Sequence, residues 1–471
     1  TITRRATDLS AGGAESLAPI SPTPFYYMSE LIYDTLVQPE LGNDQPVPGL
    51  AVQWSASADL TEWTFTLRPG VTFHDGSAFD AGDVVYSFER IKDPKLESPV
   101  TSSLAYIESV QALDPMTVRF KLAAANADFL TALQDDRVSM IPEGSGETIG
   151  SSGIGTGPFK IVTYEPEGTT ELAAFDGYWD GRPKVDGVTF VAIPDTEARV
   201  QALLAGQIDM ESISIEHAPM FVDNPQFQIL PYSNGGWNGI VFRTDTPPFD
   251  DARVRKAVRI AVNREEMIQL IAGKDGGLVA CDNPVWQGDP YHAAIDCRQN
   301  IAGARRLLAE AGYPDGIEFE LYTSDLEPAM VRYAEVYQQQ VAAAGIKVTI
   351  RLAPGDGYWT DTWMVKPVTV TSWSGMPGDL ILNEAYRSTS SWNETYYNDP
   401  AFDQLLDDAR KEADFAKRKT LYGAAQQKLF DEGGSLIAFY TSVLNVVNAR
   451  VQGIPEAHST LIRWNRVEIV E

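Results

Sequence analysis

Apolar and polar residues alternate with a period of two in several short stretches, a pattern typical of half-buried β-strands. In the clearest case Trp63, Phe65 and Leu67 alternate with polar residues. A second short strand is expected at 71–73, followed by a turn and by an acid-started helix over 84–88. This stretch therefore predicts a hairpin that leads into a helix.

Strand and helix patterns alternate in two later parts of the chain. An apolar run at 188–193 is followed by a helical pattern that ends at Gly206, and then by a strand at 208–210. A second part has the same order of elements, at 317–322, 327–344 and 346–352. Strand–helix–strand units favour parallel pairing, so we expect an α/β protein whose first sheet is mostly parallel.

Four segments, read in order, resemble the extracellular solute-binding proteins of the peptide/nickel/opine type, family 5. They are LRPGVTFHDGSAFDAGDVVYSFERI at 67–91, GTGPF at 155–159, FDGYW at 175–179 and PPFDDARVRKA at 247–257. The resemblance implies an α/β, two-lobe periplasmic-binding-protein-like fold, type II and of the large three-subdomain variety. That fold has a hinge and an interlobe ligand cleft. The resemblance also implies the periplasmic substrate-binding component of an ABC importer, which captures its solute by hinge closure.

The resemblance also suggests where the lobes begin and end. We expect the second lobe at 244–445 and an accessory subdomain of the first lobe at 39–160. One hinge crossing is placed near 243–247, and the chain is expected to return across the hinge at 444–447. The core of the first lobe is then discontinuous and consists of 1–38, 161–243 and 446–471.

The balance of charge excludes several partners. The chain carries 37 basic and 65 acidic residues, a net charge of -28. Nucleic acid and anionic membranes both attract basic surfaces, so neither is expected as a partner. No run of 18 apolar residues occurs, and Thr1 is not followed by the charged and apolar regions of a signal peptide. We therefore expect no membrane insertion and interpret the chain as a processed or trimmed periplasmic protein.

The two cysteines, Cys281 and Cys297, lie in a stretch rich in Asp, Asn, Pro and Gly. This setting favours a disulfide in an oxidising compartment. His292 lies between them, but one histidine and two cysteines make a weak metal site. The Gly-rich segment at 149–159 leads into a strand and lacks a following Lys-Ser/Thr pair, which argues against a nucleotide loop. No metal or cofactor is expected.

Aromatic residues gather where strands are predicted to end, and this is where α/β proteins bind ligands. One such stretch follows the strand at 368–373. Trp359 and Trp363 lie just upstream, four residues apart, and are interpreted as core residues rather than as ligand contacts. In the resembled family a loop equivalent to 25–27 touches ligand. The predicted ligand contacts are Phe25, Tyr26, Tyr27, Trp237, Asn238, Trp373, Ser374, Gly375, Met376, Asp379, Trp392 and Asn393.

The charge anchors of dipeptide binders do not match this sequence. In those proteins an Asp after the equivalent of Trp373-Ser-Gly pairs with the peptide's amino terminus, whereas Met376 stands here and Asp379 follows. The Arg that holds the peptide carboxylate after the strand at 317–322 is also absent. We therefore favour a neutral or cationic solute over a zwitterionic dipeptide, with counter-charges from Asp325, Glu327 or Asp379.

Nothing in the chain has the spacing of a catalytic site, so we do not expect an enzyme. Acidic pairs such as Asp407-Asp408 point to different helix faces, and His74 beside Asp75 is interpreted as structural. A secreted hydrolase is the alternative from another class. A chemoreceptor-coupled or chaperone-like binding protein is the alternative on the same fold. The expected partners are a small-molecule ligand and ABC permease subunits, for a monomer whose ligand stays open among peptides, opines, oligosaccharides and metal chelates.

Overall fold

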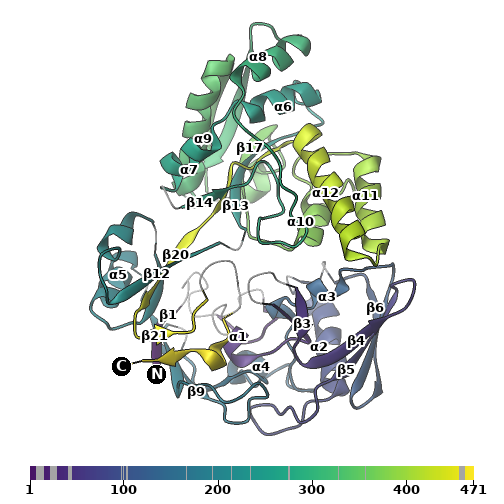
Figure 1. Ribbon diagram of the computed structural model, residues 1–471, viewed down its shortest axis with the longest axis vertical. Helices are drawn as coiled ribbons and strands as arrows, with labels where there is room; N and C mark the ends of the chain where they lie inside the picture. The colour runs from purple at the N-terminus through teal and green to yellow at the C-terminus, as the bar shows by residue number, and fades with distance from the viewer. Residues whose placement is uncertain are drawn as a thin grey trace. The chain divides into compact units, whose positions relative to one another are not determined.

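The computed structural model forms two compact units, which Figure 1 shows as ribbons. The first unit comprises Thr1–Leu230 and Leu444–Glu471, and the second comprises Pro231–Val443. The structure describes residues 1–6, 15–21, 29–40, 45–96, 98, 100–101, 104–165, 167–193, 195–213, 215–233, 235–273, 276–326, 328–355, 357–455 and 462–470.

The first unit contains a four-stranded antiparallel sheet in the order β4-β5-β7-β6. Its strands are β4 (Ala51–Ala56), β5 (Glu62–Leu67), β6 (Ile107–Asp114) and β7 (Thr117–Leu122). Trp63, Phe65 and Leu67 of β5 are buried, as their alternation predicts. The predicted hairpin is wrong, however, because β5 pairs with β4 and β7, and the segment at 71–73 forms only the bridge Thr72–Ala78.

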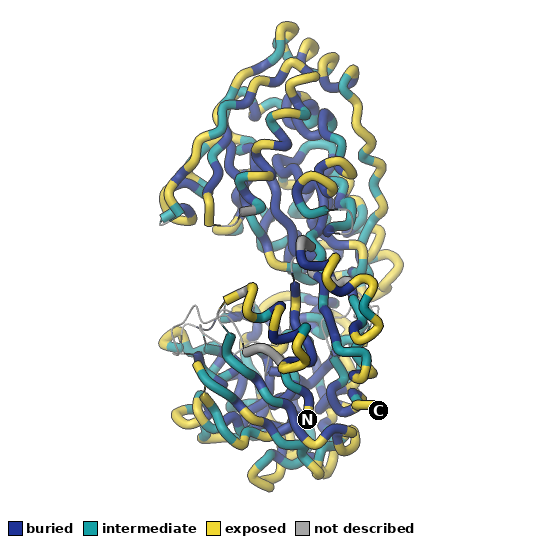
Figure 2. The backbone as a smooth tube through the Cα atoms, turned by 90° about the vertical axis from the view of Figure 1, so that its left-hand side faces the viewer, coloured by how far each residue is buried: buried dark blue, intermediate teal, exposed yellow. Residues whose placement is uncertain are grey.

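The predicted helix after this segment is α2 (Ala81–Lys92), and a capping box begins it. The Asp80 carboxylate accepts a hydrogen bond from Gly82 N at 2.7 Å, and Asp83 accepts one from Asp80 N at 2.9 Å. These bonds satisfy backbone donors that the first turn would otherwise leave unpaired. Phe88 of α2 then packs edge-on against Phe120 of the sheet. Figure 2 colours the backbone by burial and shows buried stretches inside each of the two units.

The second sheet of the first unit has seven strands, in the order β12-β20-β11-β1-β10-β9-β8. The prediction of a mostly parallel sheet is wrong. Among the described pairings of this sheet, the central strand β1 runs parallel to β10 and to β11, whereas β8–β9, β9–β10 and β11–β20 are antiparallel. The strands are β1 (Ile2–Ala6), β8 (Phe159–Thr163), β9 (Thr169–Ala174), β10 (Gly187–Ala192), β11 (Met210–Ile213), β12 (Phe227–Tyr232) and β20 (Val443–Asn448); α5 (Thr196–Leu204) connects β10 to β11.

The second unit is built on a five-stranded sheet in the order β16-β15-β17-β13-β18. β15 runs parallel to β16 and β17, and β13 runs antiparallel to β17 and β18. Its strands are β13 (Trp237–Phe242), β15 (Ile317–Ser324), β16 (Ile346–Ala353), β17 (Val368–Trp373) and β18 (Ser435–Leu436). Strands and helices are combined in both units, so the predicted α/β class is confirmed.

Helices account for most of the rest of the second unit. α6 packs against α8, α7 against α9, and α11 against α12 (Figure 1). Their bounds are α6 (Ala252–Ile260), α7 (Arg264–Ile271), α8 (Ile301–Glu310), α9 (Pro328–Val341), α10 (Gly378–Ala385), α11 (Pro400–Lys411) and α12 (Phe415–Glu432). Short elements complete the two units: α1 (Ser29–Ile32), β2 (Val37–Pro39), β3 (Pro46–Pro48), α3 (Phe129–Ala132), α4 (Ile149–Ser152), β14 (Gly277–Val279), β19 (Phe439–Thr441), β21 (Val451–Gln452) and β22 (Glu468–Ile469).

The second unit begins earlier than the predicted boundary after residue 243. β13 pairs with β17 and β18, so it belongs to the second unit, and the division falls between Leu230 and Pro231. The segment at 243–247, where a hinge crossing is expected, therefore lies inside that unit. On the return the division falls between Val443 and Leu444. The accessory subdomain at 39–160, the hinge and the interlobe cleft stay predictions.

The predicted disulfide is confirmed, since Cys281 and Cys297 are bonded to each other. A buried ionic cluster lies beside it. Asp282 accepts hydrogen bonds from Arg259 at 3.1 Å and from Arg264 at 2.7 Å, and Arg264 also donates to the carbonyl of Cys297 at 2.8 Å. All three charged side chains are buried, so the loop that carries the disulfide is tied to α6 and α7 from inside the unit.

The Gly-rich segment at 149–159 has a structural role. A Cβ added at Gly155 would lie 2.0 Å from the carbonyl oxygen of Ile32, and one at Gly157 would lie 2.5 Å from the carbonyl carbon of the same residue. Glycine is needed there because the two backbones are in close contact. The His74 ring forms a hydrogen bond with each of these two glycines. Gly155 N donates to its Nδ1 at 3.2 Å, and its Nε2 lies 3.0 Å from the Gly157 carbonyl oxygen.

Candidate functional site

Five tryptophans of the second unit form a continuous row. Trp237 stacks on Trp373 with ring centroids 6.3 Å apart, and Trp373 meets Trp392 at 6.1 Å. Trp392 meets Trp363 at 5.6 Å, and Trp363 meets Trp359 at 5.7 Å. The structure thus brings together the three tryptophans predicted as ligand contacts and adds Trp359 and Trp363, for which a core role was the favoured interpretation.

The sheet explains why residues far apart in sequence meet here. Trp237, at the start of β13, is the direct partner of Trp373, at the end of the antiparallel strand β17. The π-helix Tyr358–Thr362, which precedes β17, supplies Trp359 and leads into Trp363. The loop after α10 supplies Trp392. Because β15, β16 and β17 are parallel, their carboxyl ends lie at this same edge of the sheet, as expected for a ligand site in an α/β protein.

The row is buried at one end and exposed at the other. Trp237 is 2% exposed and Trp373 is 9% exposed, whereas Trp392 and Trp359 are 50% and 40% exposed. We call Trp359, Trp363, Trp373 and Trp392 the tryptophan platform. Large apolar side chains are seldom left this open without a binding role when they lie together. The platform therefore offers flat aromatic faces on which a solute can stack.

Glu394 holds the platform in place from within the unit, and the sequence analysis missed it. It is 1% exposed. Its carboxylate accepts hydrogen bonds from Trp363 Nε1, from Thr371 Oγ1 at 2.7 Å and from Trp373 Nε1 at 2.9 Å. Burial raises the pKa of Glu394, and these three donors partly offset that rise. The one signal in the sequence is an acidic residue between the aromatic residues Trp392 and Tyr396.

Two predicted contacts are occupied within the protein. Asp379 is bound by Arg410 at 2.8 and 2.7 Å and accepts the hydroxyl of Tyr422 at 2.7 Å. Burial works to raise the pKa of Asp379, but its net pKa lies below the ordinary value because of Arg410 and Tyr422. Asn393 uses its side chain inside its own loop, donating to the Tyr397 carbonyl at 2.8 Å. We therefore leave both residues out of the proposed contacts.

The remaining predicted contacts differ in how open they are. Ser374 is exposed, Gly375 and Met376 are half-buried, and Asn238 is buried. Asp325, offered as a counter-charge, is exposed. The last group lies outside the described residues: Phe25, Tyr26, Tyr27 and Glu327.

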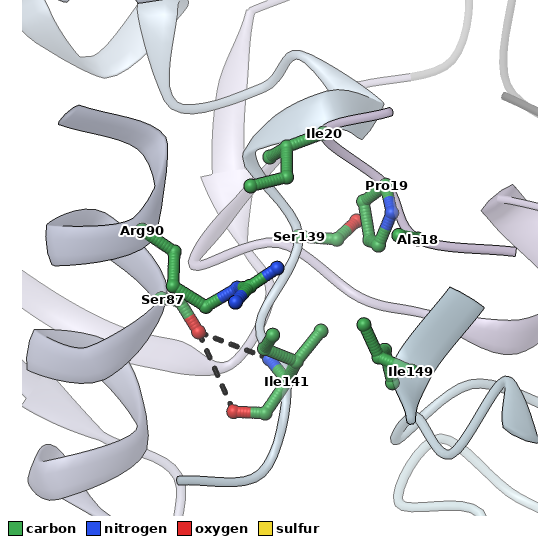
Figure 3. A pocket seen from close by; sticks show the side chains of 8 residues that line it. All are labelled: Ala18, Pro19, Ile20, Ser87, Arg90, Ser139, Ile141 and Ile149. Carbon is green, nitrogen blue, oxygen red and sulfur yellow. Dashed lines mark hydrogen bonds between the residues drawn. The ribbon is translucent and has the colours of Figure 1, made fainter. Parts of the chain in front are cut away.

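A small pocket lies in the first unit, between α2 and the segment around Ile141 (Figure 3). The guanidinium of Arg90 reaches into it, and the Ser87 hydroxyl is engaged by the backbone of Ile141 at 3.0 and 3.4 Å. Its free space is about 10 Å³, which is the room needed by roughly one water molecule. The pocket is therefore too small for the solute.

Within the described ranges, no three His, Cys, Asp or Glu side chains gather as a metal site would require. None of the helices described here combines the length and the apolar character that a bilayer crossing needs.

Comparison with known proteins assigns the chain to a family. The model of the bacterial extracellular solute-binding proteins, family 5 (middle), matches residues 45–415. The chain is 29% identical to heme-binding protein A of Haemophilus influenzae, over 92% of this chain and 86% of the relative. It is also 29% identical to the dipeptide-binding protein of Escherichia coli, over 94% of this chain and 90% of the relative.

A solved structure gives the same answer for the fold. HbpA2 from Haemophilus parasuis superposes with a TM-score of 0.89 at 25% identity, covering 100% of this chain and 99% of that one. The predicted two-lobe α/β fold class is thereby confirmed. Because the family model spans most of the sequence, this chain belongs to the bacterial extracellular solute-binding proteins of family 5.

Proposed function

We propose that this chain is the periplasmic substrate-binding component of an ABC importer and that its solute stacks on the tryptophan platform. The observation that carries the proposal is the half-exposed pair Trp392 and Trp359, at the carboxyl edge of the sheet. Trp363 and Trp373, which pack against Trp392, are fixed by hydrogen bonds to Glu394, so ordering the platform around a solute costs little side-chain entropy. The protein acts as a monomer that passes its solute to permease subunits.

The solute is neutral or cationic rather than a zwitterionic dipeptide. Met376 is apolar, and Asp379 is already paired with Arg410, so no free carboxylate is left there for a peptide amino terminus. The relatives are named for heme, glutathione and dipeptides, which differ widely in shape. Membership in one family therefore leaves the ligand class open, and the residues of this chain have to decide it.

Alanine substitutions test the site. Each removes aromatic contact area of the kind that contributes about 1–3 kcal/mol at a binding hot spot. Trp392→Ala and Trp359→Ala together should weaken solute affinity at least tenfold, measured by titration calorimetry with the solute recovered from the purified protein. Trp54→Ala, in the first unit, is the matched control and should leave the affinity unchanged. Equal affinities for all three proteins would place the solute elsewhere.

Transport is tested in the cell. Deletion of the gene should abolish uptake of that solute. Intact uptake with loss of chemotaxis toward the solute would instead favour the chemoreceptor-coupled alternative on the same fold.

A further inference from the structure

We propose that Glu394 makes the tryptophan platform selective for solutes that present a cationic group, such as an ammonium or a guanidinium. The inference rests on the proposed function and narrows its ligand class. It assigns a specificity-determining charge to a residue that lies behind the exposed rings rather than among them. Three observations support it.

The first observation is the chemistry of the hydrogen bonds. Trp363 and Trp373 can only donate through their indole N–H groups, and both donate to the Glu394 carboxylate. A protonated carboxylic acid needs an acceptor for its own hydrogen; neither indole provides one, and the Thr371 hydroxyl would have to reverse its hydrogen bond to do so. Thr371 donates at 2.7 Å to the same oxygen that Trp363 uses. The set of three donors therefore fits the ionised carboxylate.

The second observation is the absence of a compensating cation. No Lys, Arg or His within the described part of the chain forms an ion pair with Glu394. The arginines on neighbouring segments are engaged by other acids: Arg243 by Asp245 at 2.7 Å, Arg387 by Asp407 at 2.7 Å and Arg410 by Asp379 at 2.7 Å. The titratable groups that face Glu394 are the hydroxyls of Tyr358 and Tyr386, which donate to Val370 O and Ser435 Oγ.

The third observation is that the rings bonded to the Glu394 carboxylate contact a ring that is open to solvent. Trp363 and Trp373 both donate to this carboxylate, and their ring centroids lie 5.6 and 6.1 Å from that of Trp392, which is half-exposed. Charges act over about 10 Å at an ionic strength of 0.1 M, and farther through protein than through water. An aromatic face attracts cations through its quadrupole, and a nearby carboxylate adds to that attraction. An anionic group on the platform would be repelled by the same carboxylate.

Ionic quenchers of tryptophan fluorescence measure this field without knowledge of the solute. Cs⁺, iodide and neutral acrylamide are applied at constant ionic strength, and the signal of Trp392 is taken as the difference from Trp392→Phe. The measured quantity is the ratio of the Cs⁺ quenching constant to the iodide quenching constant. In the wild type this ratio should be larger for Trp392 than for free tryptophan. We expect an excess of about twofold or more.

The variants separate charge from geometry. Glu394→Gln alone would place an amide N–H against the Trp363 N–H, so Trp363→Phe serves as the background in which both forms are compared. Trp363→Phe should keep the preference for Cs⁺ over iodide, and Trp363→Phe/Glu394→Gln should lose it, with acrylamide quenching equal in the two. If removal of the Glu394 charge leaves the preference for Cs⁺ over iodide unchanged, the inference is overturned.

The solute itself gives an independent readout. The solute recovered with the protein should carry a positive charge at neutral pH and bind the double variant at least fivefold more weakly than Trp363→Phe. A solute that depends on Trp392 but is anionic, or binds both variants equally, would overturn this inference and leave the proposed stacking site intact. A solute indifferent to Trp392 would instead contradict the proposed site.

Discussion

Asp282 is a buried charge that joins three segments of the second unit. Its carboxylate joins Arg259 and Arg264 and also accepts the backbone N–H of Ile437 at 3.1 Å. The two guanidiniums are 1% and 2% exposed, so they have no access to water if the carboxylate is removed. A buried ion pair adds little net stability, but breaking one leaves a costly unpaired charge.

Asp282→Asn should therefore lower the free energy of unfolding by about 3–5 kcal/mol, measured by urea denaturation. Asp296 is the matched control, because its bond to Arg298 has the same chemistry but lies on the surface. Asp296→Asn should change stability by less than about 0.5 kcal/mol. Equal effects of the two substitutions would contradict this account of the buried cluster.

His74 gives the first unit a pH dependence with a definite sign. Burial lowers the pKa of His74 below its ordinary value, and only the neutral ring can accept from Gly155 N while donating to Gly157 O. Above the unfolded pKa of about 6.5 both states are neutral, and the contribution of His74 is complete. As the pH falls below that value the unfolded chain binds a proton more readily than the folded one, so stability is lost.

Urea midpoints measured between pH 8 and pH 5 test this expectation. The wild type should lose more stability than His74→Gln as the pH falls from 7 to 5, since glutamine can donate and accept without titrating. Parallel curves for the two proteins would show that His74 is not responsible. Groups common to both proteins cancel in the comparison.

At the scale of elements, the disulfide closes the loop between the Asp282 cluster and α8. Sixteen positions separate the two cysteines. Closing a loop of this length restricts the unfolded chain, which stabilises the fold by about 3 kcal/mol in the chain-entropy model. Reduction should lower the free energy of unfolding by about that amount.

A thiol assay tests the bond itself. Denatured, unreduced protein should contain no free thiol, and the detection of two free thiols would contradict the disulfide.

Element patterns could be read from the sequence more reliably than their pairing. The alternation of Trp63, Phe65 and Leu67 predicts which face of β5 is buried, because that face depends only on the strand's own period. The partner β7 begins at Thr117, and no local pattern indicates which distant strand pairs with β5. The division between Leu230 and Pro231 could not be read from the sequence for the same reason, since β13 owes its place in the second unit to pairing with β17 and β18.

In the candidate site, too, residues could be selected from their local sequence, whereas contacts between distant segments could not be predicted. Trp237, Trp373 and Trp392 could be selected because each stands near a predicted strand end or in an aromatic stretch. The pairing of Asp379 with Arg410 could not be predicted, since it depends on how α10 meets α11. Glu394 was missed because its role arises only from three donors contributed by separate segments.

At the scale of the whole molecule, the net charge of -28 and the uncompensated Glu394 point in the same direction. A strongly acidic protein attracts cationic solutes and repels anionic ones before any contact is made. The long-range field of the net charge is screened by salt, whereas Glu394 acts at short range on a group bound to the platform. Selectivity for a cationic group should therefore persist at high ionic strength if it comes from Glu394.

Mass spectrometry of the freshly purified protein, under native and then denaturing conditions, tests the central claim most directly. The account predicts a discrete added mass on the wild type and on Trp54→Ala that is lost on denaturation. The same mass should be absent from the Trp392→Ala/Trp359→Ala variant. Retention of that mass by the double variant would contradict a solute site on the tryptophan platform.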